Sequence, residues 1–483
     1  MDFYLLLLFI LLTAYEYCAQ ISIENKKIKV STNNNLSESI FQKRLKRFKS
    51  IKRGYYSLIA IVTFYILSLL APIWINNKPL IICFINEKWD QGENFIDTNN
   101  NNNWDDTEVF EDEYHYFFPA FWDLIDFIPG IRYPVYESTY FNQNTNNVLV
   151  DFRLLNKTCE TENNGSYVIM PLYPYHPHED LKDHLDEIYT DLNNNNKYDH
   201  AEKFIDENKN GIWDGGEKFI DENKNRIWDD GEPFIDQNDD GKWNQNNPPT
   251  KPDGFGGRHL LGTDNTGRDL FARVIDGFKV SITFAIICTF LSYSIGILIG
   301  GTLGYFGKYI DLFGVRIMEI FSALPFLFII MILSGFIQPN LFILASILVF
   351  LSGWIGISYF IRGEFYREKA KDYVSAAVSM GASNSRVMFK HILPNALTPI
   401  ITFAPFAIIG YIGTLNMLDL LGYGLQPPAA SWGEILKQAL ENLDNWHMLI
   451  FPIIAMTITL FMITFIGEAI REAFDPKVYS RLR

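Results

Sequence analysis

Six long apolar runs constrain the fold of this chain more than any other feature of its sequence. A helix needs about 20 apolar residues to cross about 30 Å of hydrocarbon. A globular domain would interrupt such runs with amphipathic periodicity. The sequence therefore predicts an all-α polytopic membrane protein with about six transmembrane helices, from the runs 55–75, 278–305, 313–337, 341–361, 397–421 and 448–470.

Charge is segregated along the 483 residues. Residues 76–258 carry a net charge of about −22, so the remainder is basic at about +7, although the whole chain carries −15. An acidic block inside a basic, apolar remainder argues against a single soluble enzyme. It also argues against a nucleic-acid-binding protein, which needs a basic surface.

Lysine and arginine set the expected orientation, because basic flanks stay in the cytoplasm. Seven such residues lie within 43–53, just before the first run. Counting alternately, the acidic block lies outside and the basic stretch 362–391 inside. The expected organisation of the chain in the lipid membrane, with both termini cytoplasmic, is a cytoplasmic or interfacial region at 1–54, a first transmembrane helix at 55–75, an extracytoplasmic insert at 76–258 and a core with five transmembrane helices at 259–483.

The first residues match no standard type of segment. Residues 3–14 form an apolar run of about 12 residues with no basic residue before it, which suits neither a full span nor a signal peptide. A cleaved signal would also export the basic cluster at 43–53, against the charge rule. An interfacial or partly inserted helix is the favoured interpretation; a mis-assigned start codon and an additional tilted span are the alternatives.

The segment between the fourth and fifth runs predicts a compact helix-turn-helix. It reads KDYVSAAVSMGASNSRVMFKHILPNA over 371–396. Asp372 is expected to cap a short first helix, and Gly381 to supply the left-handed residue that ends it. Ser383 or Asn384 then begins a second helix. The two small residues of the first helix, Ala376 and Ala377, are expected on a face that another protein approaches closely; an ordinary interhelical loop is the alternative.

This spacing resembles the EAA loop of binding-protein-dependent ABC importers. That loop has Glu-Ala-Ala, three residues, Gly, nine residues and Ile-x-Leu-Pro. The match is partial, because a Ser replaces the Glu and a His replaces the Ile. The resemblance implies an ATPase-coupling role for Ser375, Ala376, Ala377, Gly381, His391, Leu393 and Pro394.

Three further segments are similar to C-type permease subunits of dipeptide and oligopeptide ABC importers, and within that group to the microcin C/oligopeptide permease subunit. They read HLLGTDNTGRDLFAR at 259–273, LDLLGYGLQPP followed by SWG at 418–433, and IGEAIREAFDP at 466–476. The resemblance covers 260–483 closely and 45–150 in patches, including RGYYSL at 53–58. It implies the ABC importer permease fold for the core.

What the resemblance implies is an ATP-driven peptide importer of which this chain forms half of the pathway. The expected partners are a second permease subunit, a cytoplasmic ABC ATPase and an extracytoplasmic peptide-binding protein. The sequence contains no Gly-x-x-x-x-Gly-Lys-Ser/Thr phosphate loop. The chain is therefore not expected to be an enzyme, and the partner ATPase hydrolyses the ATP.

The C-terminal part of the acidic insert repeats with a period of 15, marked by Asp191, Asp206, Asp221 and Asp236. Alignment on Asp206 gives oxygen donors at loop positions 1, 3, 5, 9 and 12, with Gly211 at position 6. This is the EF-hand register, in which alternate side chains converge on one calcium ion. About three residues separate the loops, too few for paired EF-hand helices, so helix-poor EF-hand-like calcium loops are expected.

Five copies of the loop are predicted, at 97–108 and within 191–247, and calcium suits them better than magnesium, which favours fewer protein ligands. A polar Asn/Asp-rich disordered linker is the alternative interpretation. The expected calcium ligands are Asp97, Asn99, Asn101, Asp105 and Glu108; Asp191, Asn193, Asn195, Asp199 and Glu202; Asp206, Asn208, Asn210, Asp214 and Glu217; Asp221, Asn223, Asn225, Asp229 and Glu232; and Asp236, Asn238 and Asp240 in a weaker last loop.

No residue pattern indicates catalysis. His176, His178 and His184 lack metal-site or triad spacing and are interpreted as surface histidines. The four cysteines are too scattered for a zinc cluster, and Cys83 and Cys159 either pair outside the cell or remain thiols. A different class of function is a membrane-anchored calcium sensor or adhesion module, for which an ATPase-coupling loop would have no use. Glu319, Asp419 and Glu468 are the ionisable residues near span ends that merit a functional test.

Overall fold

A computed structural model describes residues 40–84, 94–96, 109–111, 115–124, 141, 150, 152–162, 166–179, 203–204, 219–220, 249–254, 259–337, 339–427 and 429–474. The chain divides into two compact units, Met1–Ser50 and Ile51–Arg483. In the first unit, helix α2 (Ile40–Ser50) carries five of the seven basic residues of the cluster at 43–53. The second unit holds all the other elements described below.

Three helices are long and apolar enough to cross a membrane: α7 (Leu270–Phe306), α14 (Leu393–Leu420), whose span extends back to Asn384, and α16 (Trp446–Phe474). Two bent pairs also qualify. They are α8 (Lys308–Ser322) with α9 (Phe326–Ser334), and α10 (Leu341–Leu348) and η2 (Val349–Gly353) with α11 (Ile355–Lys369). Within the residues described, up to five spans therefore correspond to five of the six predicted runs.

The first predicted run forms helix α3 (Lys52–Leu69), followed by the short α4 (Ala71–Trp74). Helix α3 has 18 residues and begins with two basic residues, so it is not among the helices that qualify by length and hydropathy. It packs against α16 and α7. The sixth span therefore stays a prediction.

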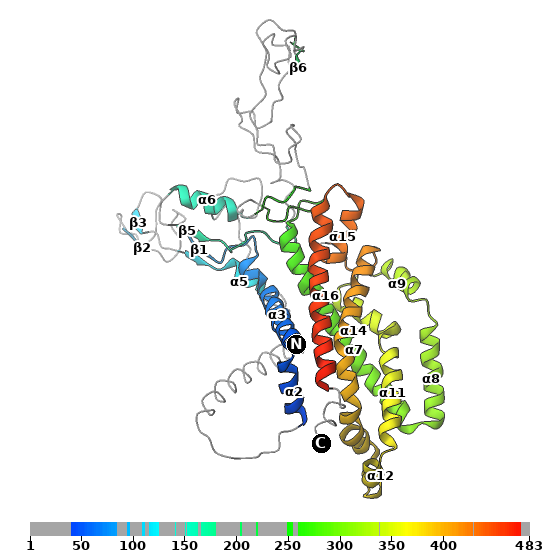
Figure 1. The fold of residues 1–483 in the computed structure, drawn as a ribbon. Helices are drawn as coiled ribbons and strands as arrows, with labels where there is room; N and C mark the ends of the chain where they lie inside the picture. The colour runs from blue at the N-terminus through cyan, green and yellow to red at the C-terminus, as the bar shows by residue number, and fades with distance from the viewer. Residues whose placement is uncertain are drawn as a thin grey trace. The chain divides into compact units, whose positions relative to one another are not determined.

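Glycines let α7 and α11 pack at close range. Gly296, Gly300 and Gly304 recur every four residues on one face of α7, and a Cβ atom at Gly300 would lie 2.3 Å from the carbonyl oxygen of Ser358 on α11. Without a hydrophobic force between helices in lipid, small residues at i and i+4 stabilise helix pairs by close van der Waals contact. This stripe therefore fixes the α7–α11 pair, which Figure 1 shows side by side.

The bends in the spans have identifiable causes. Pro325 lies between α8 and α9. The two helices are bent by 63°, because a proline interrupts helical hydrogen bonding. The π-helical segment η2 precedes the 50° bend before α11. Pro399 and Pro405 lie inside α14 without ending it. The helix is therefore interrupted at Pro325, whereas α14 continues through Pro405.

Shorter elements lie at the two ends of the spans. Between α11 and α14 are α12 (Asp372–Ser379), α13 (Asn384–Arg386) and the π-helical η3 (Val387–Ile392). Helix α15 (Trp432–Glu441) precedes α16. Figure 1 shows α12 and α15 at opposite ends of α14, so the EAA-like loop and the SWG motif that precedes α15 occupy opposite ends of the bundle.

The first half of the acidic insert contains a small mixed unit. Strand β1 (Ile81–Phe84) pairs antiparallel with β4 (His115–Phe117) on one side and β5 (Tyr167–Ile169) on the other. Helix α6 (Phe152–Glu162) packs Leu155 and Cys159 against this sheet, and α5 (Pro119–Leu124) follows β4. The description of the chain as all-α is therefore wrong for the insert, because its short β-branched and aromatic segments were obscured by the surrounding polar sequence.

Two short strand pairs complete the described part of the insert. Strand β2 (Asn94–Ile96) pairs antiparallel with β3 (Val109–Glu111), and β6 (Lys203–Phe204) pairs with β7 (Phe219–Ile220). Each pair joins residues on the two sides of one predicted calcium loop.

Candidate functional site

The predicted helix-turn-helix forms between α11 and α14. Helix α12 ends at Ser379, and Gly381 adopts φ +81°, a left-handed conformation that only glycine takes without strain. Ser383 caps α13 by accepting a hydrogen bond from the Arg386 amide at 3.4 Å. These predictions are confirmed. The expected cap at Asp372 is wrong, because Asp372 is already the first helical residue and the N-cap position is held by Lys371, whose side chain makes no capping hydrogen bond.

Burial separates the two alanines of α12. Ala376 is exposed, as is Ser375, but Ala377 is only 3% exposed. Successive helical residues point about 100° apart, so the face expected to carry both alanines carries only Ala376. Ala377 packs inward with Val374 and is therefore wrongly assigned to the docking surface.

The loop that carries Ala376 also exposes apolar side chains. Met380 is 82% exposed, and Val378 and Phe389 are also exposed. Of the other predicted coupling residues, Pro394 is exposed, whereas His391 and Leu393 are half-buried. We call the exposed set Ser375, Ala376, Val378, Met380 and Phe389 the loop tip. Exposed apolar groups gathered at one projecting tip are typical of a protein-binding surface.

Polar contacts fix the loop to the spans. Asn384 accepts a hydrogen bond from the Tyr305 hydroxyl at the end of α7 (2.8 Å). The carboxylate of Glu368 on α11 accepts from Lys371 (2.7 Å) and from the Tyr373 hydroxyl (2.9 Å). Burial, together with this bond to Glu368, raises the pKa of Tyr373. Movement of the loop must therefore move α7 and α11 with it.

A buried cluster of charged side chains lies at the opposite end of the bundle. We call it the carboxylate–guanidinium cluster, and it joins the start of α7 to α15. Arg268 contacts Asp264 at 3.0 Å, and Arg273 contacts Asp264 at 3.3 Å. Arg273 also donates to Glu434, and Gln438 bonds both carboxylates. Asp264 and Arg273 are completely buried, so the cluster's members are Asp264, Arg268, Arg273, Glu434 and Gln438.

This cluster explains two of the recognised motifs. Asp264, Arg268 and Arg273 come from HLLGTDNTGRDLFAR, whereas Glu434 follows SWG. Buried charges are tolerated only when they are paired and hydrogen-bonded. Sequence analysis identified both motifs but gave no sign that they meet, because more than 150 residues separate them.

The insert is attached to the same end of α7. The Tyr173 hydroxyl donates to Asp269 at 2.6 Å, and His259 contacts the same carboxylate oxygen at 2.9 Å. Asp269 also caps α7 by accepting from the Ala272 amide. Burial, reinforced by Asp269, raises the pKa of Tyr173. Arg273 donates to the Pro177 carbonyl at 3.3 Å, so the segment 173–177 is fixed to the core.

The histidines of this segment are not simple surface residues. His176 and His178 are half-buried, and His178 lies 3.7 Å from Asp276 of α7. Burial and the neighbouring His178 lower the pKa of His176 to about 4. His184 lies outside the described residues. Of the two cysteines expected to pair or remain thiols, Cys83 is a buried free thiol, so no disulfide joins it to Cys159.

Asp419 holds the turn between α14 and α15. Its Oδ1 atom accepts a hydrogen bond from the Leu425 amide at 2.7 Å. Gly424 and Gly433 lie against it, where a Cβ atom would meet Asp419 or the Asn416 backbone at less than 3 Å. The motif at 418–433 is therefore a packed turn. Asp419 is accounted for by structure and does not line an open site.

Two other ionisable residues of the spans form ion pairs. Glu468 contacts Arg53 of α3 at 3.3 Å, an ion pair between the ends of two helices. Glu319 contacts Arg316 at 2.6 Å. Helix α8 begins at Lys308, earlier than the apolar run, so Glu319 lies eleven residues after the first residue of this helix.

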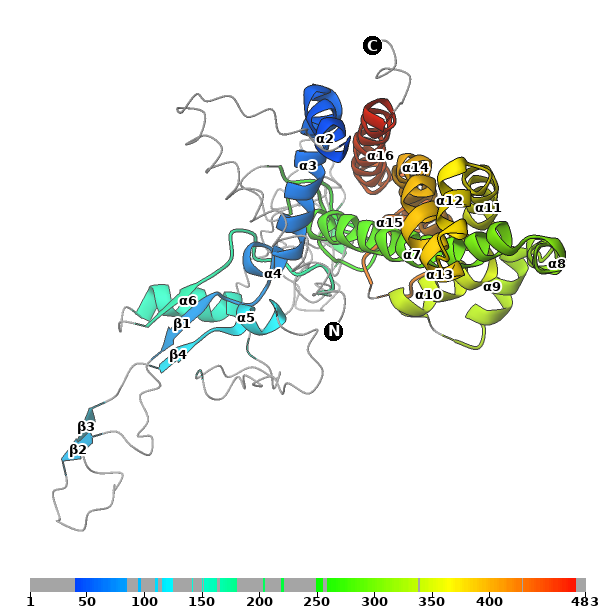
Figure 2. The ribbon, with the colours of Figure 1, turned by 90° about the horizontal axis from the view of Figure 1, so that it is seen from below.

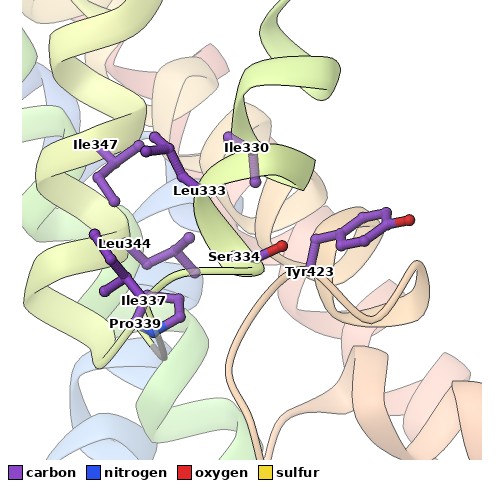
Figure 3. A pocket seen from close by; sticks show the side chains of 8 residues that line it. All are labelled: Ile330, Leu333, Ser334, Ile337, Pro339, Leu344, Ile347 and Tyr423. Carbon is purple, nitrogen blue, oxygen red and sulfur yellow. The ribbon is translucent and has the colours of Figure 1, made fainter.

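Two cavities among the described residues lack the chemistry of a peptide site. The first, shown in Figure 3, encloses about 10 Å³ between α9, α10 and Tyr423, room for no more than one water molecule. The second encloses about 340 Å³ among α3, α7, α15 and α16, and its lining, which includes Phe64, Phe271 and Trp432, is almost entirely apolar. Neither of these two cavities therefore offers a closed pathway for a peptide.

All the predicted calcium ligands lie outside the described residues. Within the described ranges, no group of three or more His, Cys, Asp or Glu residues is arranged to hold a metal ion. The calcium loops stay a prediction.

These features define a multi-pass helical membrane permease. They are the apolar spans, the projecting loop fixed to two of those spans, and the carboxylate–guanidinium cluster at the opposite end of the bundle. The family model for the binding-protein-dependent transport system inner membrane component matches residues 296–480. The chain belongs to this family, as the relatives below also show. Family membership confirms the resemblance drawn from the EAA-like loop and the three motifs, and it favours a permease over a membrane-anchored sensor.

Two relatives illustrate the similarity. The peptidoglycan transport system permease protein YejE of Agrobacterium fabrum is 40% identical over 222 residues, which are 46% of this chain and 58% of YejE. The oligopeptide transport system permease protein OppC of Haemophilus influenzae is 35% identical over 223 residues, which are 46% of this chain and 71% of OppC. The chain thus spans less than two thirds of YejE. A solved structure, the inward-facing MetNI methionine ABC transporter, is similar at 20% identity and a TM-score of 0.34, over 42% of this chain and 96% of that chain.

Proposed function

We propose that this chain is a permease subunit of an ATP-driven ABC importer for peptides, and that it couples to a cytoplasmic ATPase through the loop tip. The observation that carries the proposal is the loop between α11 and α14. Its tip is apolar and exposed, whereas its base is hydrogen-bonded to α7 and α11. A partner that moves the tip therefore moves two spans as rigid bodies, the form of coupling that alternating access requires.

The proposed partners supply what this chain lacks, namely the rest of the substrate pathway and an ATPase. No pathway is enclosed by the described residues, which supports a second permease subunit as the other half. The absence of a phosphate loop from the sequence supports a separate ATPase. Relatives named as oligopeptide and peptidoglycan permeases support a peptide-containing substrate, delivered by an extracytoplasmic binding protein. Co-purification of the ATPase with this chain, together with ATP-dependent peptide uptake in reconstituted vesicles, tests the proposal; uptake that does not require ATP would contradict it.

We expect the α12 end of the bundle to be cytoplasmic and the acidic insert to be extracytoplasmic in the inner membrane. The loop 362–391 and helix α2 are basic, and basic segments stay inside. Alkaline phosphatase fusions after Asp199 and after Ser379 should give an active and an inactive enzyme respectively, and green fluorescent protein fusions the reverse. The same activity at both positions would refute this topology.

We also propose that the insert binds calcium. The support from the structure is the register of the two strand pairs. Phe95 pairs with Phe110 across loop 97–108, and Phe204 pairs with Phe219 across loop 206–217. In both copies, the paired phenylalanines lie two residues before the first aspartate and two residues after the last glutamate. In two copies that are distant in sequence, the same phenylalanine pair therefore joins the two ends of a 12-residue loop. The donor positions of both loops match the EF-hand register.

Calcium titration of the full chain in nanodiscs should show binding with a dissociation constant on the order of 10⁻⁴ to 10⁻³ M, the range of extracellular modules. The pair Asp206→Ala and Glu217→Gln removes the donors at loop positions 1 and 12 and should lower the stoichiometry by about one ion. Glu207→Gln is the matched control, because position 2 donates no ligand. Calorimetry with no calcium-dependent heat up to about 10 mM, well above that range, would support a plain polar linker instead.

A further inference from the structure

Helix α8 carries an ion pair deep in its span. Arg316 lies about 12 Å along the helix axis from Lys308, and Glu319 about 16 Å, at 1.5 Å per residue. Because the bent span formed by α8 and α9 crosses about 30 Å of hydrocarbon, the pair lies near its middle. The side chains of Arg316 and Glu319 are nevertheless 67% and 47% exposed. In Figure 2, α8 lies at the edge of the helical bundle.

The exposed surface of α8 divides into two edges. Met318 is buried and packs with Val315 and Phe321 against α7 and α11. On one side, Leu312, Arg316, Glu319 and Ser322 follow at i, i+4, i+7 and i+10, spacing that places them on one helical edge. We call these four residues the polar edge. The other side, the apolar edge, consists of Ile310, Phe313, Ile317 and Ile320.

The polar edge is unsuited to lipid. A charged side chain at the centre of a bilayer is costly and almost always faces a protein interior or water. Arg316 does not reach back toward the interface near Lys308, as a snorkelling side chain would, because its guanidinium contacts Glu319, one turn deeper. Among the described residues, Glu319 is the one hydrogen-bond partner of Arg316. The remaining guanidinium donors therefore require water or a polar ligand.

Asp311, the other acidic residue of α8, contrasts with the Arg316–Glu319 pair. Asp311 at the start of α8 bonds Arg362 and the Tyr366 hydroxyl of α11, so this carboxylate faces α11 and not the polar edge. Whereas Asp311 has two partners on α11, Arg316 and Glu319 are hydrogen-bonded, within the described residues, only to each other. Each keeps free hydrogen-bonding capacity at a depth where a passing substrate would meet it.

We propose that the polar edge of α8 lines the water-filled substrate pathway, where Arg316 and Glu319 pair with the carboxylate and ammonium termini of a peptide in transit. The assignment to peptide termini rests on the proposed function. The Arg316 guanidinium attracts a terminal carboxylate, and the Glu319 carboxylate attracts a terminal ammonium, so either end of a peptide meets an opposite charge as it passes this edge.

Cysteine accessibility tests the position of the polar edge without requiring transport. Ser322→Cys and Ile320→Cys are matched, because both side chains are exposed at nearly the same place along α8 but lie on opposite edges. In membranes containing the full importer, a cationic, membrane-impermeant methanethiosulfonate should label Ser322→Cys about tenfold faster than Ile320→Cys, because the reagent attacks only the hydrated thiolate. Equal rates, or faster labelling at Ile320→Cys, would overturn the proposal.

Uptake by reconstituted importer tests the role of the charges. The measurement is the ratio of uptake of a peptide with a free C-terminal carboxylate to uptake of its C-terminal amide. Arg316→Gln should lower this ratio about tenfold relative to wild type, as expected for loss of one charge-assisted contact. Both preparations contain the same binding protein, so its own preference between the two peptides cancels when the ratios are compared. An unchanged ratio would overturn the pairing with peptide termini. If wild type imports neither peptide, the proposed substrate class is wrong, and the labelling pattern still decides the position of the edge.

Discussion

Replacing Asp264 with alanine is expected to destabilise the folded protein by about 3–5 kcal/mol, the cost of removing one partner from a buried ion pair. Asp264 is completely buried and contacts Arg268 and Arg273. Without it, two guanidinium groups share the single remaining carboxylate of Glu434. The thermal midpoint of the detergent-purified variant, measured by loss of the monodisperse chromatographic peak, should fall well below that of wild type.

The matched control for this experiment is Glu468→Ala, which removes the carboxylate of the exposed pair with Arg53. An exposed pair contributes about 0–1 kcal/mol, so this variant should unfold close to wild type. If Asp264→Ala unfolds at the same temperature as Glu468→Ala, the carboxylate–guanidinium cluster does not hold α15 on α7.

Replacing Ala376 with arginine should lower ATP-dependent peptide uptake more than about tenfold and leave the protein folded. The exposed Ala376 lies among the apolar residues of the loop tip, and a long charged side chain there would hold the ATPase away. Loss of a central contact costs about 2 kcal/mol or more, which corresponds to about thirtyfold in affinity. The measurements are uptake and the amount of ATPase that co-purifies.

Two variants separate docking from folding. Ala376→Ser keeps a small side chain at the same position and should transport as wild type does. Ala377→Arg places the same arginine one residue later, where the side chain is buried, and should reduce the yield of folded protein. Normal uptake by Ala376→Arg would show that the ATPase docks elsewhere.

The contrast between these alanines shows where sequence reasoning stops. The motif spacing identified the helix, the left-handed Gly381 and the cap at Ser383, because each depends on the local chain. It assigned both alanines to one face, because the motif names residue types and not their direction. Only packing against the rest of the loop turned Ala377 inward. The five apolar runs were found because hydropathy also depends only on neighbouring residues. The start of α8 at Lys308, before the apolar run, was not found in this way, and it changed the position of Glu319 within its helix.

The sequence by itself determined that the chain crosses a membrane, that it resembles peptide permeases, and that its insert repeats a calcium-loop register, because hydropathy, motif order and periodicity are properties of neighbouring residues. Only the tertiary structure decided that Asp264, Arg268 and Arg273 meet Glu434, that Tyr173 of the insert binds the cap of α7, and that Arg316 and Glu319 share an exposed edge. Charges buried in a membrane protein need partners, and the partners come from helices that are distant in sequence and adjacent only after the spans have packed.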